Sequence, residues 1–113
     1  MELNTLSALA EPNRLRIVEL LRDGPRPVGE IAERLVLRQP QVSKHLRVLS
    51  EAGWVEVRPV AQQRIYQLQA KPFLELDSWL ETFRRFWETR LDTLDEYMQE
   101  LKEAQKRAKG EQE

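Results

Sequence analysis

Residues 39–52 combine an apolar stripe with side chains that can bind nucleic acid. On a helical wheel, Val42, Leu46 and Leu49 lie within about 60° of one another and must face a core. The other sides carry amides, a hydroxyl, two cations and a proline: Gln39, Pro40, Gln41, Ser43, Lys44 and Arg47. Glutamine can pair with adenine, lysine and arginine with guanine, and serine with either kind of group. The segment is therefore predicted to be a helix that reads the major groove of DNA.

A shorter helix is predicted just before this one, with Ile31, Ala32 and Leu35 on its inner face. Two helices joined by a tight turn, here within residues 28–54, are the usual device for placing one helix in the major groove. A polar helix face is equally expected of an ordinary solvated surface. The residues after the second helix therefore decide between DNA binding and simple solvation.

Residues 54–68 change to an alternating pattern rich in strand formers, which predicts a β-hairpin, the wing. Pro59 lacks a backbone N–H and predicts an edge position for the first strand. The polar residues at or near the tip are Gln62, Gln63 and Arg64. Arg64 is the strongest candidate for contact with a phosphate or the minor groove. A basic wing next to a polar helix face favours DNA binding over simple solvation.

The preceding segments supply the scaffold. A first short helix is expected after a cap at Asn4 or Thr5, and a second begins at Pro12 and ends at Asp23-Gly24-Pro25. Leu15 is expected in the buried stripe of this second helix. His45, the only histidine, lies beside the apolar stripe and is predicted to be packed and hydrogen-bonded, because a lone histidine cannot build a metal site.

From Pro72 to about Ala108 the helical period returns without glycine or proline, which predicts one helix of roughly 50 Å. Apolar residues at spacings of three and four form a seam of the coiled-coil type. The residues expected to bury a homodimer interface are Leu3, Leu6, Leu80, Phe83, Trp87, Leu91, Leu94 and Met98. The predicted organisation is a DNA-binding domain over 1–71, a dimerisation helix over 72–108 and a frayed tail over 109–113.

Charge and composition agree with this division. The net charge is −1, but residues 12–71 carry 11 Lys and Arg against 6 Asp and Glu, whereas residues 72–113 carry 7 against 11. A basic segment beside an acidic one is what a nucleic-acid face with a separate solvated face shows. There are no cysteines, no apolar run long enough for a membrane span and no secretion signal at the N-terminus. The expected location is the cytoplasm, without membrane contact.

Two other classes of function, catalysis and protein binding, make different demands on the sequence. Catalysis by acyl transfer needs a nucleophile beside a base, but Ser43 and His45 are two residues apart on a helix and do not face each other, so the chain is not expected to be an enzyme. The alternative is a winged scaffold that binds another protein through exposed aromatics: Trp79, Phe86, Trp87 and Tyr97. The competing interpretation is that these aromatics fill the homodimer core.

Several segments, in this order, resemble the ArsR-type winged helix-turn-helix repressors: LAEPNRLRIVELLRDG, VGEIAERL, QPQVSKHLRVLSEAGWVEVR and RIYQL. The likeness covers residues 6–69, and the tail LDSWLETFRRFWETRLDTLDEYM is similar to the autorepressor (SdpR-like) branch. The resemblance implies a homodimer with the order α-α-α-α-β-β-α, which pairs through its first and last helices. It also implies that Gln39, Ser43 and Lys44 touch operator DNA and that the protein represses its own or an adjacent operon.

The sequence departs from that family at four places. Metal-sensing members carry cysteines where this chain has Arg26 and Pro27, and the last helix has no histidine. Metal sensing of that kind is therefore expected to be absent, no cofactor is expected, and any small-molecule effector stays unidentified. Val36 stands where relatives commonly have glycine, so that either the turn is strained or its path differs. Arg38 stands where a serine often caps the recognition helix, so capping is expected to be weak or to pass to Gln39.

Overall fold

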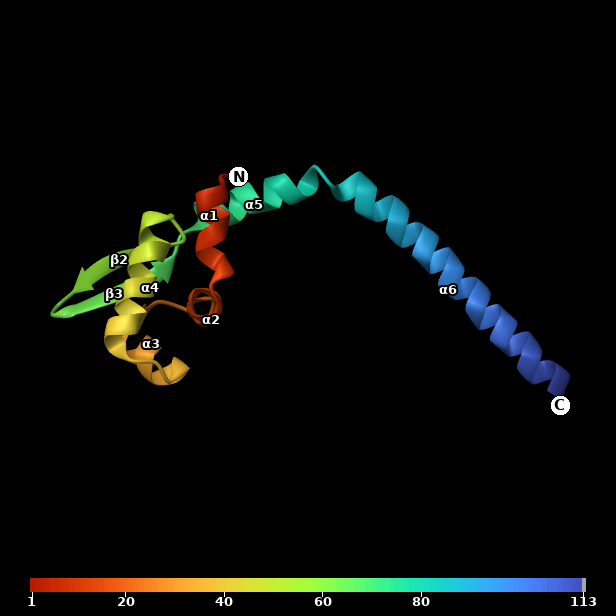
Figure 1. The fold of residues 1–113 in the computed structure, drawn as a ribbon, viewed down its shortest axis with the longest axis horizontal. Coiled ribbons are helices and arrows are strands. Elements are labelled where there is room, and N and C mark those ends of the chain that lie inside the picture. The colour runs from red at the N-terminus through yellow and green to blue at the C-terminus, as the bar shows by residue number, and fades with distance from the viewer. Residues whose placement is uncertain (113) are drawn as a thin grey trace. The chain divides into compact units, whose positions relative to one another are not determined.

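The computed structural model describes residues 1–112 and contains seven helical and three strand segments within that range. They are α1 (Leu3–Ser7), the 3-10 turn η1 (Ala8–Ala10), α2 (Pro12–Leu21), β1 (Arg26–Pro27), α3 (Val28–Leu35), α4 (Gln39–Glu51), β2 (Val55–Val60), β3 (Gln63–Leu68), α5 (Ala70–Glu81) and α6 (Arg84–Gln112) (Figure 1). The chain forms two compact units that divide between Asp77 and Ser78. The first has the predicted winged helix-turn-helix fold.

The core of the first unit lies where α2, α3 and α4 meet the base of the sheet. Its fully buried large side chains are Ile17, Ile31, Val42, Leu46, Leu49, Trp54 and Val55. The predicted burial of Leu15 is wrong, because this side chain is exposed. On α2 the buried stripe is centred on Ile17, Val18 and Leu21, and Leu15 lies roughly 110° away from that centre at 100° per residue.

The turn between α3 and α4 carries backbone strain at Val36. Its φ is 56° and its ψ is 48°, in the left-handed region, and its side chain is 89% exposed. The Leu37 N–H donates to the Ala32 carbonyl at 3.0 Å, which closes the helix end in the manner that usually employs glycine. Of the two alternatives that the sequence left open, the strained turn is the one observed.

Replacing Val36 with glycine is expected to raise the free energy of unfolding by about 0.5–1 kcal/mol. Removing the left-handed penalty of roughly 1–2 kcal/mol outweighs the entropy that glycine adds to the unfolded chain. Urea denaturation followed by circular dichroism measures the difference. Val48→Gly is the matched control, since Val48 lies inside α4 and its replacement should lower stability by about 1 kcal/mol. Loss of stability in Val36→Gly as well would show that the turn carries no such strain.

The sheet has the order β1-β3-β2, with every pair antiparallel. β2 and β3 form the predicted wing, with Val55 opposite Leu68 and Val60 opposite Gln63. Ala61, with a φ of 55°, begins the two-residue turn. Pro59 lies on β2, which pairs on one side only, so its predicted edge position is confirmed. The short β1 was not predicted, because two residues show no alternation.

The single long helix predicted over 72–108 is wrong. α5 and α6 are separated at Thr82 and Phe83, whose N–H groups donate to carbonyls three residues back, at Trp79 and Leu80. The Thr82 hydroxyl also donates to the Trp79 carbonyl at 2.7 Å. A threonine that bonds locally in this way competes with the helical ladder.

The predicted ends of two helices also need correction. α6 continues to Gln112, so the expected helix end near Ala108 is wrong. Of the tail expected to fray, residues 109–112 are helical, and residue 113 lies outside the described residues. α1 begins at Leu3 without a side-chain cap, before the predicted Asn4 or Thr5. Within the range that the structure describes, no helix has both the length and the apolar character needed to cross a membrane.

Candidate nucleic-acid interface

The outer face of α4 is solvent-exposed over its whole length. The predicted inner face of α4 is confirmed, because Val42, Leu46 and Leu49 are completely buried. Every predicted DNA-contacting residue of this helix is exposed: Gln39, Pro40, Gln41, Ser43, Lys44 and Arg47. Arg47 forms an ion pair with Glu51 one turn later, at 3.2 Å, in which the arginine side chain is 82% exposed. An exposed pair of this kind is worth only a few tenths of a kcal/mol, so Arg47 is available to a ligand.

The beginning of α4 has no side-chain cap. Arg38 occupies the cap position in an extended conformation and provides no side-chain hydrogen bond, as its residue type predicted. The Gln41 and Val42 N–H groups bond to the Arg38 carbonyl instead. The first turn of α4 is therefore held by backbone bonds and by Pro40, which fits the start of a helix.

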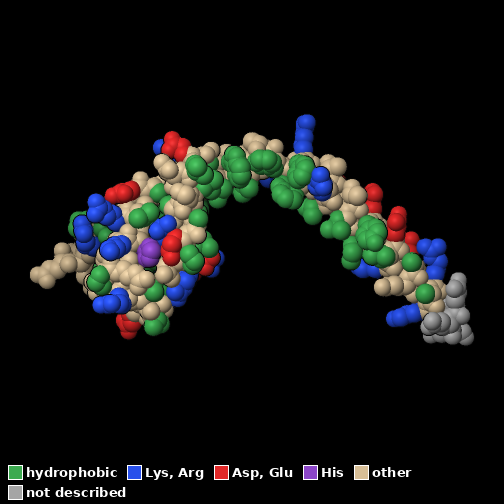
Figure 2. All heavy atoms as spheres, viewed as in Figure 1, with side chains coloured by type: hydrophobic (Ala, Val, Ile, Leu, Met, Phe, Trp, Pro, Cys, Tyr) green, Lys and Arg blue, Asp and Glu red, His purple; other side chains and the backbone are tan. Residues whose placement is uncertain are grey.

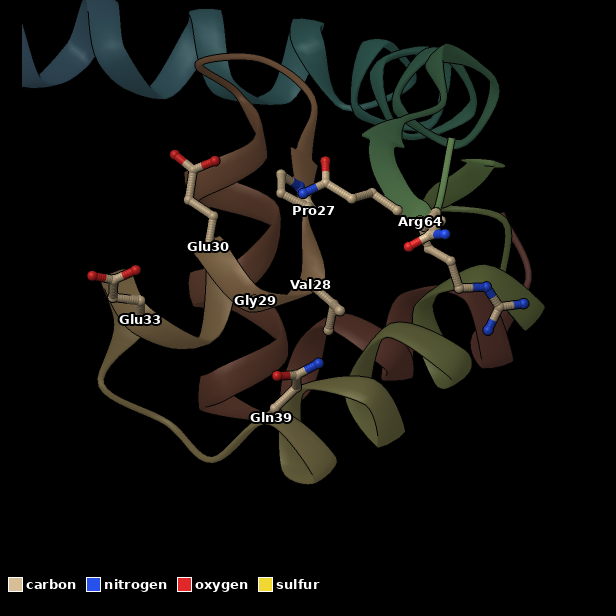
Figure 3. A pocket seen from close by; sticks show the side chains of 9 residues that line it. Pro27, Val28, Gly29, Glu30, Glu33, Gln39 and Arg64 are labelled. Carbon is tan, nitrogen blue, oxygen red and sulfur yellow. The ribbon is translucent and has the colours of Figure 1, made fainter. Parts of the chain in front are cut away.

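The wing and the start of α4 border one shallow hollow of about 530 Å³ (Figure 3). Gln39 lines it from α4 and Arg64 from β3, together with Gln62 and Gln63 at the wing tip. All four are exposed. The hairpin thus brings Gln39, the first residue of α4, together with the three wing residues that the sequence predicted for DNA contact.

Acidic side chains on α3 line the opposite wall of this hollow. Glu30 accepts from Arg26 at 2.7 Å and from Arg34 at 3.3 Å, so two cations compensate its charge. Glu33 lines the same wall. An anionic ligand therefore approaches the amide and Arg64 side more favourably than the α3 side.

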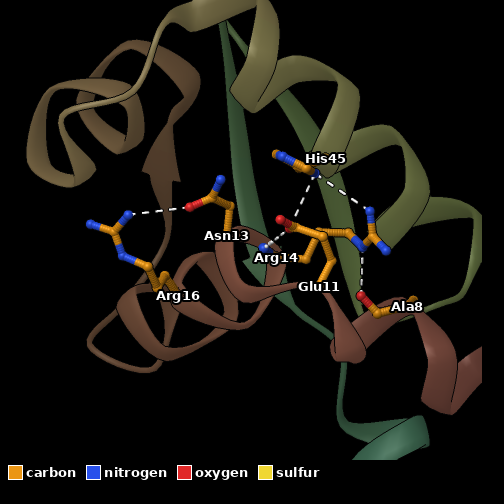
Figure 4. Close-up of polar contacts among 6 residues, drawn as sticks. All are labelled: Ala8, Glu11, Asn13, Arg14, Arg16 and His45. Carbon is orange, nitrogen blue, oxygen red and sulfur yellow. Dashed lines mark hydrogen bonds and ion pairs between the residues drawn. The ribbon is translucent and has the colours of Figure 1, made fainter.

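A polar cluster ties α4 to the N-terminal segment of the chain (Figure 4). His45 Nδ1 lies 3.6 Å from Glu11 Oε2 and 3.5 Å from an Arg14 guanidinium nitrogen, and the histidine side chain is 16% exposed. The Arg14 Nε donates to the Ala8 carbonyl at 2.6 Å. The packed, hydrogen-bonded role predicted for His45 is confirmed. Glu11 and Arg14 were missed, although an acidic residue directly before Pro12 is a detectable cap signal.

Glu11 is the N-cap of α2, and its Oε2 accepts from the Arg14 N–H at 2.8 Å. Burial raises the pKa of the Glu11 carboxyl. Hydrogen bonds from the Arg14 and Asn13 amides and the charges of His45 and Arg14 lower it by more, so the net pKa lies below its usual value. The folded state therefore favours the ionised carboxylate.

This depressed pKa predicts a pH-dependent contribution to stability. The contribution is fully present above the ordinary glutamate pKa of about 4.3 and is lost as the pH falls through the lower folded value. Glu11→Gln keeps an acceptor oxygen but removes the charge. We expect the urea midpoint of the wild type to exceed that of Glu11→Gln at pH 7, and the gap to narrow steadily as the pH falls below the ordinary glutamate pKa of about 4.3. A gap that is independent of pH would contradict this role of the charge.

The residues predicted for dimerisation are largely uncovered in the single chain. Leu6 is half-buried, and the other seven, on α1, α5, α6 and the residue before α6, are exposed: Leu3, Leu80, Phe83, Trp87, Leu91, Leu94 and Met98. Figure 2 shows hydrophobic side chains gathered along α5 and α6. Among the residues that the structure describes, no three His, Cys, Asp or Glu side chains are grouped to hold a metal ion.

Sequence comparisons place this chain among DNA-binding regulators. A family model described as "Helix-turn-helix domain" matches residues 9–58. The HTH-type transcriptional regulator Rv2034 of Mycobacterium tuberculosis is 44% identical over 80 residues, which span 71% of this chain and 72% of the relative. The transcriptional repressor SdpR of Bacillus subtilis is 29% identical over 80 residues, covering 71% of this chain and 89% of the relative.

Solved structures of similar fold agree with the sequence matches. The ArsR family transcriptional regulator RHA00566 is 28% identical, with a TM-score of 0.66 over 75% of this chain and 88% of that one. The homodimeric winged helix-turn-helix DNA-binding domain of Mb0332 from Mycobacterium bovis, described as a possible ArsR-family regulator, is 27% identical. Its TM-score is 0.61 over 73% of this chain and 76% of that one.

Proposed function

Since this chain belongs to the ArsR family of winged helix-turn-helix transcription regulators, we propose that it is a homodimeric repressor of its own or an adjacent operon. The family is one of regulators and not of enzymes. Its members act on genomic DNA, so the proposed place of action is the cytoplasm. Repression follows when the bound dimer excludes RNA polymerase from the promoter.

One observation carries this proposal: the α4 residues expected to meet DNA are all exposed, and Gln39 at the start of that helix borders the same hollow as the wing residue Arg64. With α4 in the major groove, Ser43, Lys44 and Arg47 face the base edges and the flanking phosphates. Arg64 and the wing-tip amides Gln62 and Gln63 then lie beside the adjacent backbone or minor groove. The N-terminal end of α4, which enters the groove first, consists of Gln39, Pro40 and Gln41.

A homodimer accounts for the uncovered apolar seam. Exposed apolar surface of this extent on one chain marks an interaction site, and the similar domain from Mycobacterium bovis is homodimeric. A twofold dimer presents two α4 helices to successive major grooves, about 34 Å apart, on a pseudo-palindromic operator. We propose that α1, α5 and α6 contribute the interface.

Within the family, we propose that the chain belongs to the autorepressor branch and does not sense metals through cysteines. Support comes from the similarity to SdpR and from Arg26 and Pro27, which stand where the family resemblance implies the cysteines of metal-sensing members. Arg26 is already engaged by Glu30. Autoregulation by concentration alone needs no effector, so a small molecule is an optional addition to this mechanism.

Fluorescence anisotropy with the DNA upstream of its own operon tests the proposal. We expect saturation at two chains per duplex, specific binding at least a thousandfold tighter than to a shuffled duplex, and a steep loss of affinity with salt. A reporter gene behind the same DNA should fall in expression when the protein is supplied. Equal binding to the shuffled duplex would refute sequence-specific regulation.

A protein-binding role is the second candidate, because Trp79, Phe86, Trp87 and Tyr97 are exposed. Arg90 lies 4.5 Å above the Phe86 ring, so this surface mixes aromatic and cationic character. Analytical ultracentrifugation separates the two candidates. A dimer at micromolar concentration supports the homodimer, whereas a monomer under the same conditions favours an interaction with another protein.

A further inference from the structure

His45 lies on α4 at the border of the face proposed to meet DNA. It follows Lys44 directly, so the two side chains point about 100° apart around the helix axis. Lys44 is exposed, whereas the imidazole is largely covered by the start of α2. His45 is also the only histidine of the chain, and histidine is the side chain that ordinarily changes its charge between pH 5 and pH 8. Proton uptake in that range therefore points to this one ring.

Two groups of opposite charge compete for one atom of the ring (Figure 4). His45 Nδ1 lies 3.6 Å from Glu11 Oε2 and 3.5 Å from Arg14 Nη1. A guanidinium can only donate and a carboxylate can only accept. Without a proton, Nδ1 can accept from Arg14 but turns a lone pair toward Glu11. With a proton, Nδ1 can donate toward Glu11 but leaves Arg14 Nη1 without this acceptor, so the neutral ring satisfies one partner at a time.

Both partners are held in place by bonds that do not involve the histidine. Glu11 Oε2 accepts from the Arg14 N–H at 2.8 Å, and Arg14 Nε donates to the Ala8 carbonyl at 2.6 Å. A change in the protonation of His45 therefore meets a fixed carboxylate on one side and a fixed guanidinium on the other. The carboxylate attracts the proton and the guanidinium repels it, so their balance is open to a third charge.

The other elements that pack against α4 supply no further charge to this ring. These elements are α3, β2 and η1. On α3, the Glu30 carboxylate is paired with two arginines, and on β2, the Glu56 carboxylate accepts from two glutamines. The turn η1 carries no charged side chain. Within the part of the chain that the structure describes, Glu11 and Arg14 are the charged groups that His45 contacts.

We propose that His45 is a positioning residue for operator binding and that each protomer takes up a proton on this ring when it binds DNA. The inference rests on the proposed function and adds a regulation of the same surface. The proton comes from the solvent, and the ring gains one positive charge. In that form it pairs with Glu11, the N-cap of α2, and ties α4 to the start of α2.

The phosphates of the bound duplex supply the third charge. A phosphate that meets Lys44 lies within about 10 Å of the ring, the width of a helix. This is also about the Debye length at 0.1 M salt, so the phosphate potential still acts on the ring. The negative potential reinforces Glu11 and opposes Arg14, which favours the charged ring in the complex over the charged ring in the free protein.

The predicted result is an operator affinity that rises as the pH falls. A proton bound more tightly in the complex than in the free protein strengthens binding in the acid range, and this gain is lost as the pH rises. With two protomers, we expect affinity to be about three- to tenfold higher at pH 5.5 than at pH 7.5 in low salt, and the difference to shrink in high salt. Fluorescence anisotropy with the upstream duplex measures both.

His45→Asn is the first test, because an amide can replace Nδ1 as a donor or an acceptor but takes up no proton in this range. Every other titrating group is common to the two proteins, so the difference between their pH profiles belongs to His45. We expect the rise in affinity toward pH 5.5 in the wild type and a flat profile in His45→Asn. Equal slopes in the two proteins would overturn the proposal.

Two charge variants that retain the histidine should move the profile in opposite directions. Glu11→Gln removes the anion that attracts the proton, so the midpoint of the rise should move to lower pH. Arg14→Gln removes the cation that repels it, so the midpoint should move to higher pH. Urea denaturation at each pH identifies the range in which each variant is folded. Shifts of the same sign in the two folded variants would overturn the role of the cluster.

The same titrations separate this inference from the proposed function. Specific binding to the upstream duplex with an affinity independent of pH refutes the proton uptake and leaves the repressor intact. Absence of specific binding at every pH between 5.5 and 7.5 refutes the repressor itself.

Discussion

Replacing Lys44 and Arg47 together with alanine is expected to weaken operator binding at least a hundredfold. Both side chains are exposed on the outer edge of α4, and a dimer loses four cationic contacts. A well-formed contact to a base edge is worth about 1–3 kcal/mol, so even about 1 kcal/mol for each predicts a loss of roughly three orders of magnitude. The measurement is anisotropy with the upstream duplex at fixed salt.

The matched control is K106A/R107A, which removes one lysine and one arginine from exposed positions of α6. This variant lowers the net charge by the same amount but should change the affinity for operator DNA little, since Lys106 and Arg107 lie outside the proposed DNA interface. Where Lys44 and Arg47 meet phosphates, the slope of log affinity against log salt should also become shallower by about 0.9 per lost contact. Equal losses in both variants would show that binding responds to net charge alone.

Trp54→Ala is expected to cause the largest loss of stability, about 3–5 kcal/mol. The Trp54 ring is completely buried at the end of α4. It packs edge-to-face on Phe73 at 4.9 Å, and its Nε1 donates to the Thr5 carbonyl at 2.6 Å. One side chain thus holds α1 and the start of α5 against the core, so its removal leaves a cavity and an unpaired carbonyl.

Urea denaturation of three variants separates these contributions. Trp54→Phe retains an aromatic ring but loses the hydrogen bond and part of the volume, and should fall between the wild type and Trp54→Ala. Leu74→Ala truncates an exposed residue of α5 and should change stability by less than about 0.5 kcal/mol. A loss in Trp54→Ala no larger than in Leu74→Ala would contradict the central role of this ring.

The helix-turn-helix and the wing could be predicted because their signals are local. The apolar stripe of α4, Pro12 at the start of α2 and the alternation along β2 each follow from periods of 3.6 or 2 residues or from a single helix-start signal. The exposed edge with Lys44 and Arg47 follows from the same wheel. For this reason the residues expected to face DNA could be placed on the surface from the sequence alone, while their contact with DNA stays a prediction.

The features that the sequence did not reveal depend on tertiary contacts or on single hydrogen bonds. The cluster of Glu11, Arg14 and His45 joins residues up to 34 positions apart, and no local period marks it. The separation of α5 from α6 coincides with single backbone bonds from Thr82 and Phe83 to carbonyls three residues back, and no glycine or proline marks that place in the sequence. β1 exists only because β3 is available to pair with Arg26 and Pro27.

The position of Pro59 has a consequence for how the protein behaves at high concentration. β2 has one side paired with β3 and the other side open to solvent. An open strand side can recruit a foreign strand and seed polymeric sheet, and a proline there removes one donor from that template. The wing is thus a poorer nucleus for amyloid-like growth, because the solvent side of its edge strand lacks one donor.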